Sequence, residues 1–380
     1  MSATPPNAAR ARRAPSRVAV IGTGLIGASL GLALRRLDDV EEVVGYDADP
    51  AELEIAVKRG AVSRAASSAR EAAEGVGLAV LAVPLSAIGS VAAEVAPVLP
   101  KGSLLTDVAS VKGRAVEALQ AAAPAGVHVI GGHPMAGSHE TGASHASADL
   151  FVGATYLLTP TTHTDAGAFE QLHALISRIG ARPLAVEPER HDLLVAVVSH
   201  LPQLAATTLM NLASERARSE HAGLLLLAAG GFRDATRVAA SNPDLWLEIC
   251  GENRDAIISV LDDYVDRVER LRAVLAGSDD AGLRRVLDDA REARRTLPGK
   301  EVPAGTFVEL LIAIPDRPGL LAEVTTTVGG VGVNIEDLSI EHAAEGGRGV
   351  LRLQIAGEHA AAVARGALEQ RGHEVVERIR

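Results

Sequence analysis

The stretch Val18-Ala19-Val20-Ile21-Gly22-Thr23-Gly24-Leu25-Ile26-Gly27 decides the fold of this chain. Its first four residues form an apolar run typical of a buried strand, and a helical pattern follows the glycines directly. A strand, a glycine-rich turn and a helix in this order form a dinucleotide-binding fingerprint. Such glycines allow backbone amides and the helix N-terminus to approach a pyrophosphate; the alternative is that they serve packing alone. We expect a Rossmann-type domain whose cofactor contacts include Gly22, Gly24, Leu25, Ile26 and Gly27.

The next apolar run indicates which dinucleotide is bound. Residues 43–46 are followed by Asp47, twenty residues after Gly27. A carboxylate at this place accepts hydrogen bonds from an adenosine ribose and repels a ribose phosphate. Because no Arg or Lys follows Asp47, we predict NAD rather than NADP as the cofactor. The same site is expected to include Val83 and Pro84, at the end of a later strand.

Composition limits the class of protein. The chain has 380 residues, of which 47% are hydrophobic, enough for two or three cores. A net charge of −11 gives no attraction to nucleic acid or anionic lipid, so we expect neither partner. The single cysteine, Cys250, cannot form an intramolecular disulfide, which favours a cytoplasmic location.

The order of predicted elements divides the chain into domains. Residues 1–16 are expected to be a disordered tail. Strands and helices then alternate over residues 17–187, which predicts an α/β domain with one doubly wound parallel sheet. Because ligands bind beyond the carboxyl ends of such strands, residues 107–112 and 133–135 should face one cleft. Residues 188–297 predict an all-helical domain, and exposed apolar faces on its long helices favour association with a partner chain.

The C-terminal part has a different pattern. After a predicted linker at residues 298–304, residues 305–380 show a βαββαβ order, which predicts a ferredoxin-like α+β domain. This order and the turn Asp316-Arg317-Pro318-Gly319 resemble an ACT domain, a module that senses amino acids. The resemblance implies that tyrosine or another amino acid binds there as an effector; the alternative is a module that only mediates dimer contacts. The implied ligand residues are Asp316, Pro318, Gly319, Asn334 and Ile335.

Several polar residues are candidates for chemistry. His133 lies between glycines and a proline, so we expect its strand to end there and its imidazole to face a cleft and titrate near neutrality. Ser110 can orient a hydroxyl beside this base, with a helix cap as the alternative role. His200 precedes a proline at an expected helix irregularity, and Arg237 offers a planar fork for a carboxylate. Together these residues suggest oxidation of an acidic hydroxy compound.

Five motifs together resemble the prephenate dehydrogenase family over residues 17–290. They are Gly-Thr-Gly-Leu-Ile-Gly-Ala-Ser-Leu (22–30), Thr-Asp-Val-Ala-Ser-Val-Lys (106–112), Gly-Gly-His-Pro-Met-Ala-Gly-Ser (131–138), His191-Asp192 followed by Ser199-His200-Leu201-Pro202, and Gly-Phe-Arg-Asp-Ala-Thr-Arg (231–237). The resemblance implies NAD-dependent oxidative decarboxylation of prephenate to 4-hydroxyphenylpyruvate, in tyrosine biosynthesis, by a homodimer joined through the helical domain.

The resemblance also implies roles for individual residues. His133 would accept the proton of the ring hydroxyl, which Ser110 would hold. The substrate would be bound by His200, Arg237, Gln203 and Trp246. For Trp246, packing against a neighbouring helix is the alternative. His191 and Asp192 are expected to form an ordinary first helical turn, and Lys112 to cap or solvate the start of a helix.

Alternatives to this function remain open at this stage. The neutral Gln203 favours prephenate over arogenate, whose ammonium group would favour an acidic neighbour. A second alternative is a non-catalytic sensor of NAD and an amino acid, and a third is a dehydrogenase of small hydroxy acids. The third would use a lysine in the helical domain, and no lysine lies between Pro188 and Pro298. His139 stands where the family often has an acidic residue. We expect no metal site formed by His133, His139 and His145, because neither their spacing nor an available cysteine supports one.

Overall fold

The computed structural model describes most of the chain, in two compact units, Met1–Asp289 and Ala290–Arg380. The described residues are 15–137, 140–221, 223–296, 307–315, 320–333, 335, 337–342 and 348–379. Most of the tail predicted at residues 1–16 and the whole linker predicted at 298–304 lie outside them.

A six-stranded parallel sheet forms the centre of the first unit, with the order β3-β2-β1-β4-β5-β6. The strands are β1 (Arg17–Ile21), β2 (Glu42–Tyr46), β3 (Arg64–Ala65), β4 (Leu78–Leu81), β5 (Leu104–Asp107) and β6 (His128–Val129). In β1, Val18 and Val20 pack into the core on one face, while Ala19 and Ile21 pack into the core on the other. Burial on both faces explains why this strand is a continuous apolar run.

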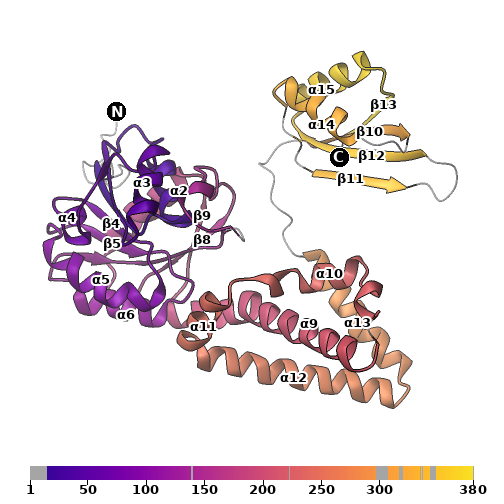
Figure 1. The fold of residues 1–380 in the computed structure, drawn as a ribbon, viewed down its shortest axis with the longest axis horizontal. Coiled ribbons are helices and arrows are strands. Elements are labelled where there is room, and N and C mark those ends of the chain that lie inside the picture. Colours follow the sequence, from indigo (N-terminus) through magenta and orange to yellow (C-terminus); the bar gives the residue numbers. More distant parts are fainter. Residues whose placement is uncertain are drawn as a thin grey trace, which may run out of the picture. The chain divides into compact units, whose positions relative to one another are not determined.

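Helices cover both faces of this sheet (Figure 1). On one face lie α2 (Leu25–Leu34), α3 (Pro50–Lys58) and α7 (Ala166–Arg178). On the other lie α4 (Ala69–Ala73), α5 (Ile88–Val95) and α6 (Gly113–Ala122). Short 3₁₀ turns occur at Leu85–Ala87, Ala96–Val98 and Ala143–His145. The predicted doubly wound Rossmann-type sheet is therefore confirmed for these six strands.

A separate three-stranded sheet corrects the expectation of one sheet over residues 17–187. It consists of β7 (Gly131–Pro134), β8 (Thr155–Thr159) and β9 (Arg182–Ala185), in which β7 pairs antiparallel to β8. Two glycines make this possible. A Cβ atom on Gly131 would lie 2.3 Å from the Thr159 hydroxyl, and one on Gly132 would lie 2.6 Å from the Asp107 carbonyl oxygen. Only residues without side chains let the chain pass this close to β5 and β8.

The rest of the first unit is helical, as predicted. Its elements are α8 (Pro188–Val195), a π-helical turn (Ala196–His200), α9 (Leu201–Ser219), a 3₁₀ turn (Leu224–Leu227), α10 (Gly230–Thr236), a 3₁₀ turn (Arg237–Ala240), α11 (Pro243–Glu252), α12 (Arg254–Ala276) and α13 (Asp280–Thr296), which runs past Asp289. In the described part of the chain, one helical stretch, Pro188–Ser219, has the length and apolar composition of a membrane span, a test that core helices of soluble proteins also pass.

The second unit contains a four-stranded antiparallel sheet with the order β11-β12-β10-β13. Its elements are β10 (Phe307–Pro315), α14 (Leu320–Gly330), β11 (Asp337–His342), β12 (Arg348–Ala356), α15 (Glu358–Gln370) and β13 (Val375–Ile379). Both helices contribute to one apolar core with the sheet. Of the predicted effector residues, Ile335 packs against this core, while Asp316, Pro318, Gly319 and Asn334 lie outside the described residues.

Candidate active site

The glycine turn after β1 combines two packing glycines with one open glycine. Gly22 has a φ of +90°, and an added Cβ atom would lie 2.2 Å from the carbonyl oxygen of Ala82. A Cβ atom on Gly27 would lie 1.9 Å from the carbonyl oxygen of Gly22. Gly24 differs, because an added Cβ atom would meet nothing within 4 Å. The first two glycines close the turn, and the third leaves its backbone accessible to a ligand at the N-terminus of α2.

Asp47 is fixed beside this turn. Its Oδ2 accepts hydrogen bonds from the backbone N–H of Thr23 at 2.6 Å and from the Thr23 hydroxyl at 3.2 Å. Its Oδ1 accepts one from the backbone N–H of Asp49 at 2.9 Å. A half-buried carboxylate at the end of β2, next to an open glycine turn, fits the ribose and pyrophosphate of a dinucleotide. Val83 and Pro84 follow β4, and the Val83 backbone nitrogen lines the turn 3.1 Å from the Cβ position of Gly22.

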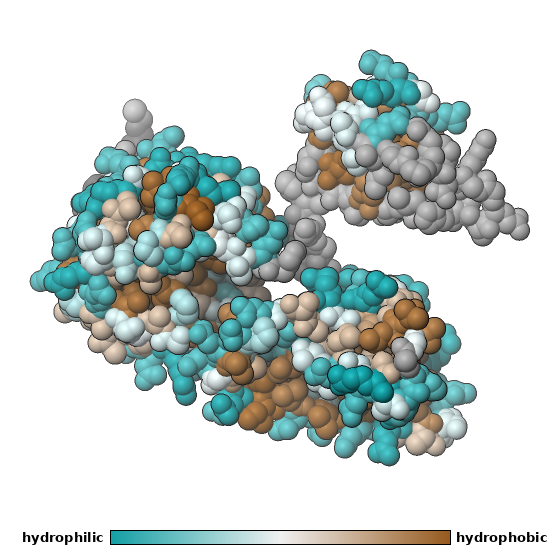
Figure 2. Space-filling view, in the orientation of Figure 1, coloured by the Kyte–Doolittle hydropathy of each residue, from teal (hydrophilic) through white to brown (hydrophobic). Residues whose placement is uncertain are grey.

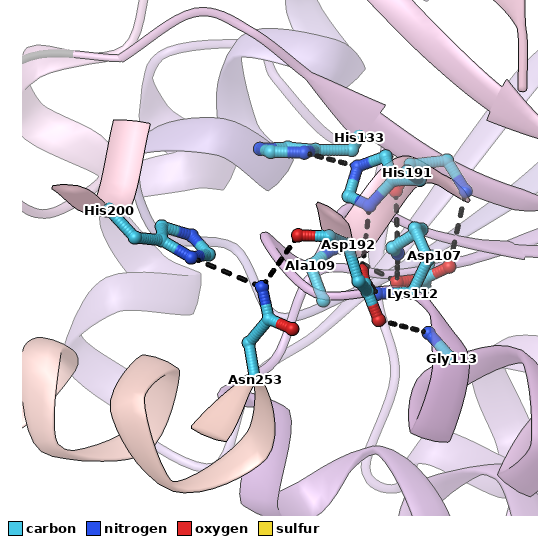
Figure 3. A network of polar contacts seen from close by, with 10 residues as sticks. Asp107, Ala109, Lys112, Gly113, His133, His191, Asp192, His200 and Asn253 are labelled. Atoms are coloured by element: carbon cyan, nitrogen blue, oxygen red, sulfur yellow. Dashed lines mark hydrogen bonds and ion pairs between the residues drawn. The ribbon is translucent and has the colours of Figure 1, made fainter. Parts of the chain in front are cut away.

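His133 is the next-to-last residue of β7, which ends at Pro134 as predicted, and only 8% of its surface is exposed. Its Nδ1 lies 2.9 Å from Nε2 of His191, and Nδ1 of His191 lies 2.8 Å from Oδ1 of Asp192 (Figure 3). His191 is fully buried. His191 and Asp192 lie near the start of α8, as expected, but they do more than form a helical turn, since both belong to a chain of polar contacts that ends at His133.

A buried ion pair holds the residue before His133. Lys112 and Asp107 pair with each other and are both fully buried. Lys112 Nζ donates to the carbonyl oxygen of Gly132 at 2.8 Å, and Oδ1 of Asp107 accepts from the Gly132 N–H at 3.2 Å. Lys112 occupies the N-cap position of α6, but its side chain does not cap or solvate the helix as predicted, because its ammonium group lies in the interior. The pair fixes the backbone of Gly132 and hence the position of His133.

Asp192 also caps helix α6. Its Oδ1 accepts from the backbone N–H of Lys112 at 2.7 Å, and its Oδ2 accepts from that of Gly113 at 2.8 Å. The cap of this helix thus comes from the helical domain, and Ser110 does not provide it. Ser110 is half-buried in the turn between β5 and α6, and its hydroxyl makes no hydrogen bond to any described residue. It is therefore available to a substrate.

His200 lies in the π-helical turn between α8 and α9, which confirms the predicted helix irregularity. Only 1% of its surface is exposed. Nδ2 of Asn253 lies 3.2 Å from Nδ1 of His200 and donates to the carbonyl oxygen of Asp192 at 2.9 Å. The indole of Trp246 meets the His200 ring edge-on, with the ring centroids 5.8 Å apart. The packing role weighed for Trp246 is thus present within one chain.

The other two predicted substrate residues differ in exposure. Gln203, one turn after His200, is buried, and its Oε1 accepts from the Ser241 hydroxyl at 3.3 Å. Arg237 is exposed, and its guanidinium forms no ion pair with a described residue. The structure therefore brings His133, His200 and Gln203 into the buried site region but leaves Arg237 at the surface, with its five donors free for a ligand.

Burial determines the charge of the two site histidines. It lowers the pKa of His133 well below 6.5, and the neighbouring His191, Lys112 and His200 lower it further. Burial also lowers the pKa of His200 to about 4, against an opposing effect of Asp192. The expectation that His133 titrates near neutrality is wrong, because the protein interior disfavours its charged form. Both imidazoles are neutral at pH 7, so each ring has a nitrogen lone pair that can accept a hydrogen bond or a proton.

No group of three or more His, Cys, Asp or Glu side chains within the described residues is arranged to bind a metal ion. His145, which was weighed as a metal ligand, lies 3.0 Å from a carboxylate oxygen of Glu140. His139 lies outside the described residues.

Two family models match the first unit over most of its length. The model described as "Prephenate dehydrogenase, nucleotide-binding domain" matches residues 30–185, and that described as "Prephenate dehydrogenase, dimerization domain" matches residues 187–289. Prephenate dehydrogenase of Bacillus subtilis is 32% identical to this chain over 342 residues, which cover 88% of this chain and 91% of the relative.

Two solved structures share the fold of the first unit. Prephenate dehydrogenase from Aquifex aeolicus, crystallised with hydroxyphenyl propionate and NAD+, is 26% identical with a TM-score of 0.69, over 74% of this chain and 98% of that chain. Arogenate dehydrogenase from Synechocystis is 30% identical with a TM-score of 0.67, over 74% of this chain and 100% of that chain.

Proposed function

Because the chain belongs to the prephenate dehydrogenase family, we propose that it catalyses the NAD-dependent oxidative decarboxylation of prephenate to 4-hydroxyphenylpyruvate, a step of tyrosine biosynthesis. One observation carries the proposal. The strand that holds the neutral His133 begins against Asp107 at the carboxyl end of β5, and the open glycine turn follows the carboxyl end of β1 in the same sheet. Ligands of such sheets bind at this edge.

The residues supply positioning and one proton transfer. NAD+ held at the glycine turn would supply the hydride acceptor for the ring carbon that carries the hydroxyl. His133 accepts the hydroxyl proton, while Ser110 orients the same hydroxyl. The carboxylate on the opposite ring carbon leaves as carbon dioxide, and its bonding electrons make the ring aromatic. The proton returns to the phenolic oxygen, so the substrate loses one hydride and one carbon dioxide.

Asp47 supports NAD as the cofactor. Its carboxylate is held beside the turn by three hydrogen bonds from Thr23 and Asp49. A phosphate on the adenosine ribose would bring a second negative charge to this place, where the sequence offers no neighbouring Arg or Lys. The Aquifex aeolicus structure contains NAD+, which agrees with this assignment.

The substrate's polar groups are assigned to His200, Arg237, Gln203 and Trp246. Arg237 binds a carboxylate, since it is free and carries a fixed charge. The neutral Gln203 favours the keto acid side chain of prephenate. The alternative substrate is arogenate, which is supported by the likeness to the Synechocystis arogenate dehydrogenase.

A homodimer through the helical domain is the proposed assembly, in the cytoplasm. Hydrophobic residues gather on the surface of the helices around α9, α11 and α12 (Figure 2). Leu226 is 88% exposed and Val198 is 65% exposed, so large side chains face water in the single chain. Such patches mark sites of association. The match of this region to a dimerization domain supports a second copy of the chain as the partner.

Regulation by tyrosine or another amino acid is proposed for the second unit, as an ACT domain. Its βαββαβ order and antiparallel sheet support this assignment. Since the match to the Bacillus subtilis relative covers 88% of this chain, it extends past Asp289 into this unit. Calorimetric titration of the full chain with tyrosine tests the idea. Heat of binding that disappears in a chain lacking residues 300–380 supports it, and no heat from the full chain with any aromatic amino acid removes it.

The first experiment follows NADH absorbance with prephenate or arogenate. Fast turnover with prephenate and NAD is expected, whereas faster turnover with arogenate would replace the substrate and keep the mechanism.

In a parallel series, His133→Asn should lose most turnover, by roughly a hundredfold or more, and still bind NAD. His163→Asn, at an exposed histidine, is the matched control and should leave turnover unchanged. Wild-type protein that binds NAD but turns over neither substrate would favour a non-catalytic sensor.

A further inference from the structure

We propose that Asp192 gives the two site histidines opposite tautomers, so that His133 presents a proton acceptor at Nε2 and His200 presents a hydrogen-bond donor at Nε2. The proposal deepens the proposed function and rests on it for the identity of the substrate. Asp192 acts through His191 on one side and through Asn253 on the other (Figure 3). All three are positioning residues.

The partners of Asp192 determine that its carboxylate acts as a hydrogen-bond acceptor. The backbone N–H groups of Lys112 and Gly113 can only donate, so both carboxylate oxygens accept. These donors are the first N–H groups of helix α6, whose positive end favours a negative charge. A carboxylate that caps a helix in this way is ionised and accepts every hydrogen bond that reaches it.

The first branch runs from the Asp192 side chain to His133. Nδ1 of His191 lies 2.8 Å from Oδ1 of Asp192, so Nδ1 carries the hydrogen. With its hydrogen on Nδ1, His191 presents a lone pair at Nε2. Nδ1 of His133, 2.9 Å away, must therefore donate to it. The second nitrogen of His133, Nε2, is left with a lone pair and can accept a proton.

The second branch runs from the Asp192 main chain to His200. The carbonyl oxygen of Asp192 only accepts, which requires the amide nitrogen of Asn253 at 2.9 Å and fixes the orientation of this amide. The same nitrogen lies 3.2 Å from Nδ1 of His200 and has a second hydrogen to give. Nδ1 of His200 therefore accepts. The hydrogen of the neutral ring is on Nε2, which can donate to a substrate.

Opposite tautomers match the two ends of the proposed reaction. The ring hydroxyl loses a proton while hydride leaves, so it needs a lone pair, which His133 offers. The substrate's carboxylate and keto oxygens only accept, so they need a donor, which His200 offers. With the tautomer of His133 reversed, an N–H would face the hydroxyl that must lose its proton. With the tautomer of His200 reversed, a nitrogen lone pair would face a substrate oxygen that can only accept. One aspartate thus sets both polarities without charging either ring.

Tautomers are measured directly by long-range ¹H–¹⁵N NMR of the full chain labelled with ¹⁵N-histidine at pH 7.5. Resonances are assigned by the loss of a signal in His133→Asn and in His200→Asn. The expected result is a hydrogen on Nδ1 of His133 and on Nε2 of His200. Either ring in the other tautomer overturns the proposal. This readout needs no turnover, so a failure of the proposed substrate and a failure of the tautomer assignment are separable.

Two variants then separate the branches. Asp192→Asn places an amide N–H among groups that must all donate to it, so we expect kcat to fall roughly a hundredfold with KM for prephenate nearly unchanged. Asn253→Asp replaces the donor to His200 by an acceptor. His200 should move its hydrogen to Nδ1, and KM should rise about tenfold, which corresponds to one lost hydrogen bond.

A second capping aspartate provides the control for an effect on stability alone. Asp165 caps α7 by accepting from the N–H of Ala168 at 2.9 Å and lies outside the network. Asp165→Ala removes this cap and should lower the melting temperature while leaving kcat unchanged. If Asp192→Asn does not fold, His191→Asn tests the first branch in its place, and either variant with wild-type kcat overturns that branch.

Discussion

Lys112 and Asp107 form an ion pair in which neither side chain is accessible to solvent, and the backbone of Gly132 is hydrogen-bonded to both of them. The pair joins the turn before α6 to the strand that carries His133. Desolvating two charges is costly, and here the cost is offset by their mutual attraction and by hydrogen bonds to Gly132 and to the N–H of Ala109. The pair therefore fixes the position of the proposed base.

Breaking this pair should destabilise the first unit strongly. Lys112→Met leaves the Asp107 carboxylate buried without its cation, and we expect a loss of about 3–5 kcal/mol in the free energy of unfolding. Urea denaturation measures it. Lys101→Met, at an exposed lysine, is the control and should change the free energy by less than about 0.5 kcal/mol. Equal effects of the two substitutions would contradict the structural role of the pair.

The glycine turn allows cofactor binding and folding to be separated. Gly24→Ala adds a methyl group to open space at a φ of −65°, so the melting temperature should stay unchanged. In the proposed binding mode the same methyl group would meet the pyrophosphate, so NAD should bind about tenfold or more weakly, as measured by calorimetry.

Gly22→Ala is the matched comparison. Its methyl group would meet the Ala82 carbonyl at a φ of +90°, and the protein should lose about 2 kcal/mol or more. Unchanged NAD affinity in Gly24→Ala would place the cofactor elsewhere.

Asp47 should control the choice between NAD and NADP. Asp47→Ser removes the charge that repels a ribose phosphate and keeps a hydroxyl near the Thr23 N–H. The ratio of kcat/KM for NADP to that for NAD should rise about tenfold or more, because a like-charge repulsion is removed. Asp49→Ser, at the adjacent helix cap of α3, is the control, since serine also caps helices. A ratio that rises equally in both variants would show that Asp47 is not the selective residue.

Local patterns predicted the parts of the fold that depend on neighbouring residues. The strand, turn and helix around Gly22 follow from apolar residues and glycines within a few positions, as does the π-helical irregularity before Pro202. The separate sheet was not predicted, because the Gly131–Pro134 segment pairs antiparallel with β8, more than twenty residues later. The sequence feature that indicates this sheet is the Gly131-Gly132 pair, which permits a close approach of two backbones. The spacing of apolar residues does not indicate such an approach.

The buried polar residues escaped prediction for a similar reason. Asp192 meets Gly113 across 79 positions, and Asn253 meets His200 across 53. An aspartate in the first turns of a helix has an ordinary explanation in its own helix, so the sequence alone favoured that role. Lys112 is expected from the sequence to cap or solvate the start of a helix, because lysine is seldom fully buried. The only sequence signal was its position in the motif of residues 106–112, five residues after its partner Asp107.

The lowered pKa values of the site histidines predict that the protein loses stability in mild acid. In the unfolded chain a histidine titrates near 6.5, whereas His200 in the folded protein titrates at about 4. Between these values the unfolded state binds more protons, so the free energy of unfolding falls as the pH falls below about 6.5, by up to roughly 3 kcal/mol for this residue. His133, whose pKa is also lowered by burial, adds to the slope.

Urea denaturation at pH 7.5, 6.5, 5.5 and 4.5 measures the free energy of unfolding as a function of pH. His200→Gln should flatten this curve, whereas His163→Asn should not, because His163 is exposed. If His200→Gln and wild type lose stability in parallel, the acid sensitivity arises from carboxylates instead, and the burial of a neutral His200 does not govern it.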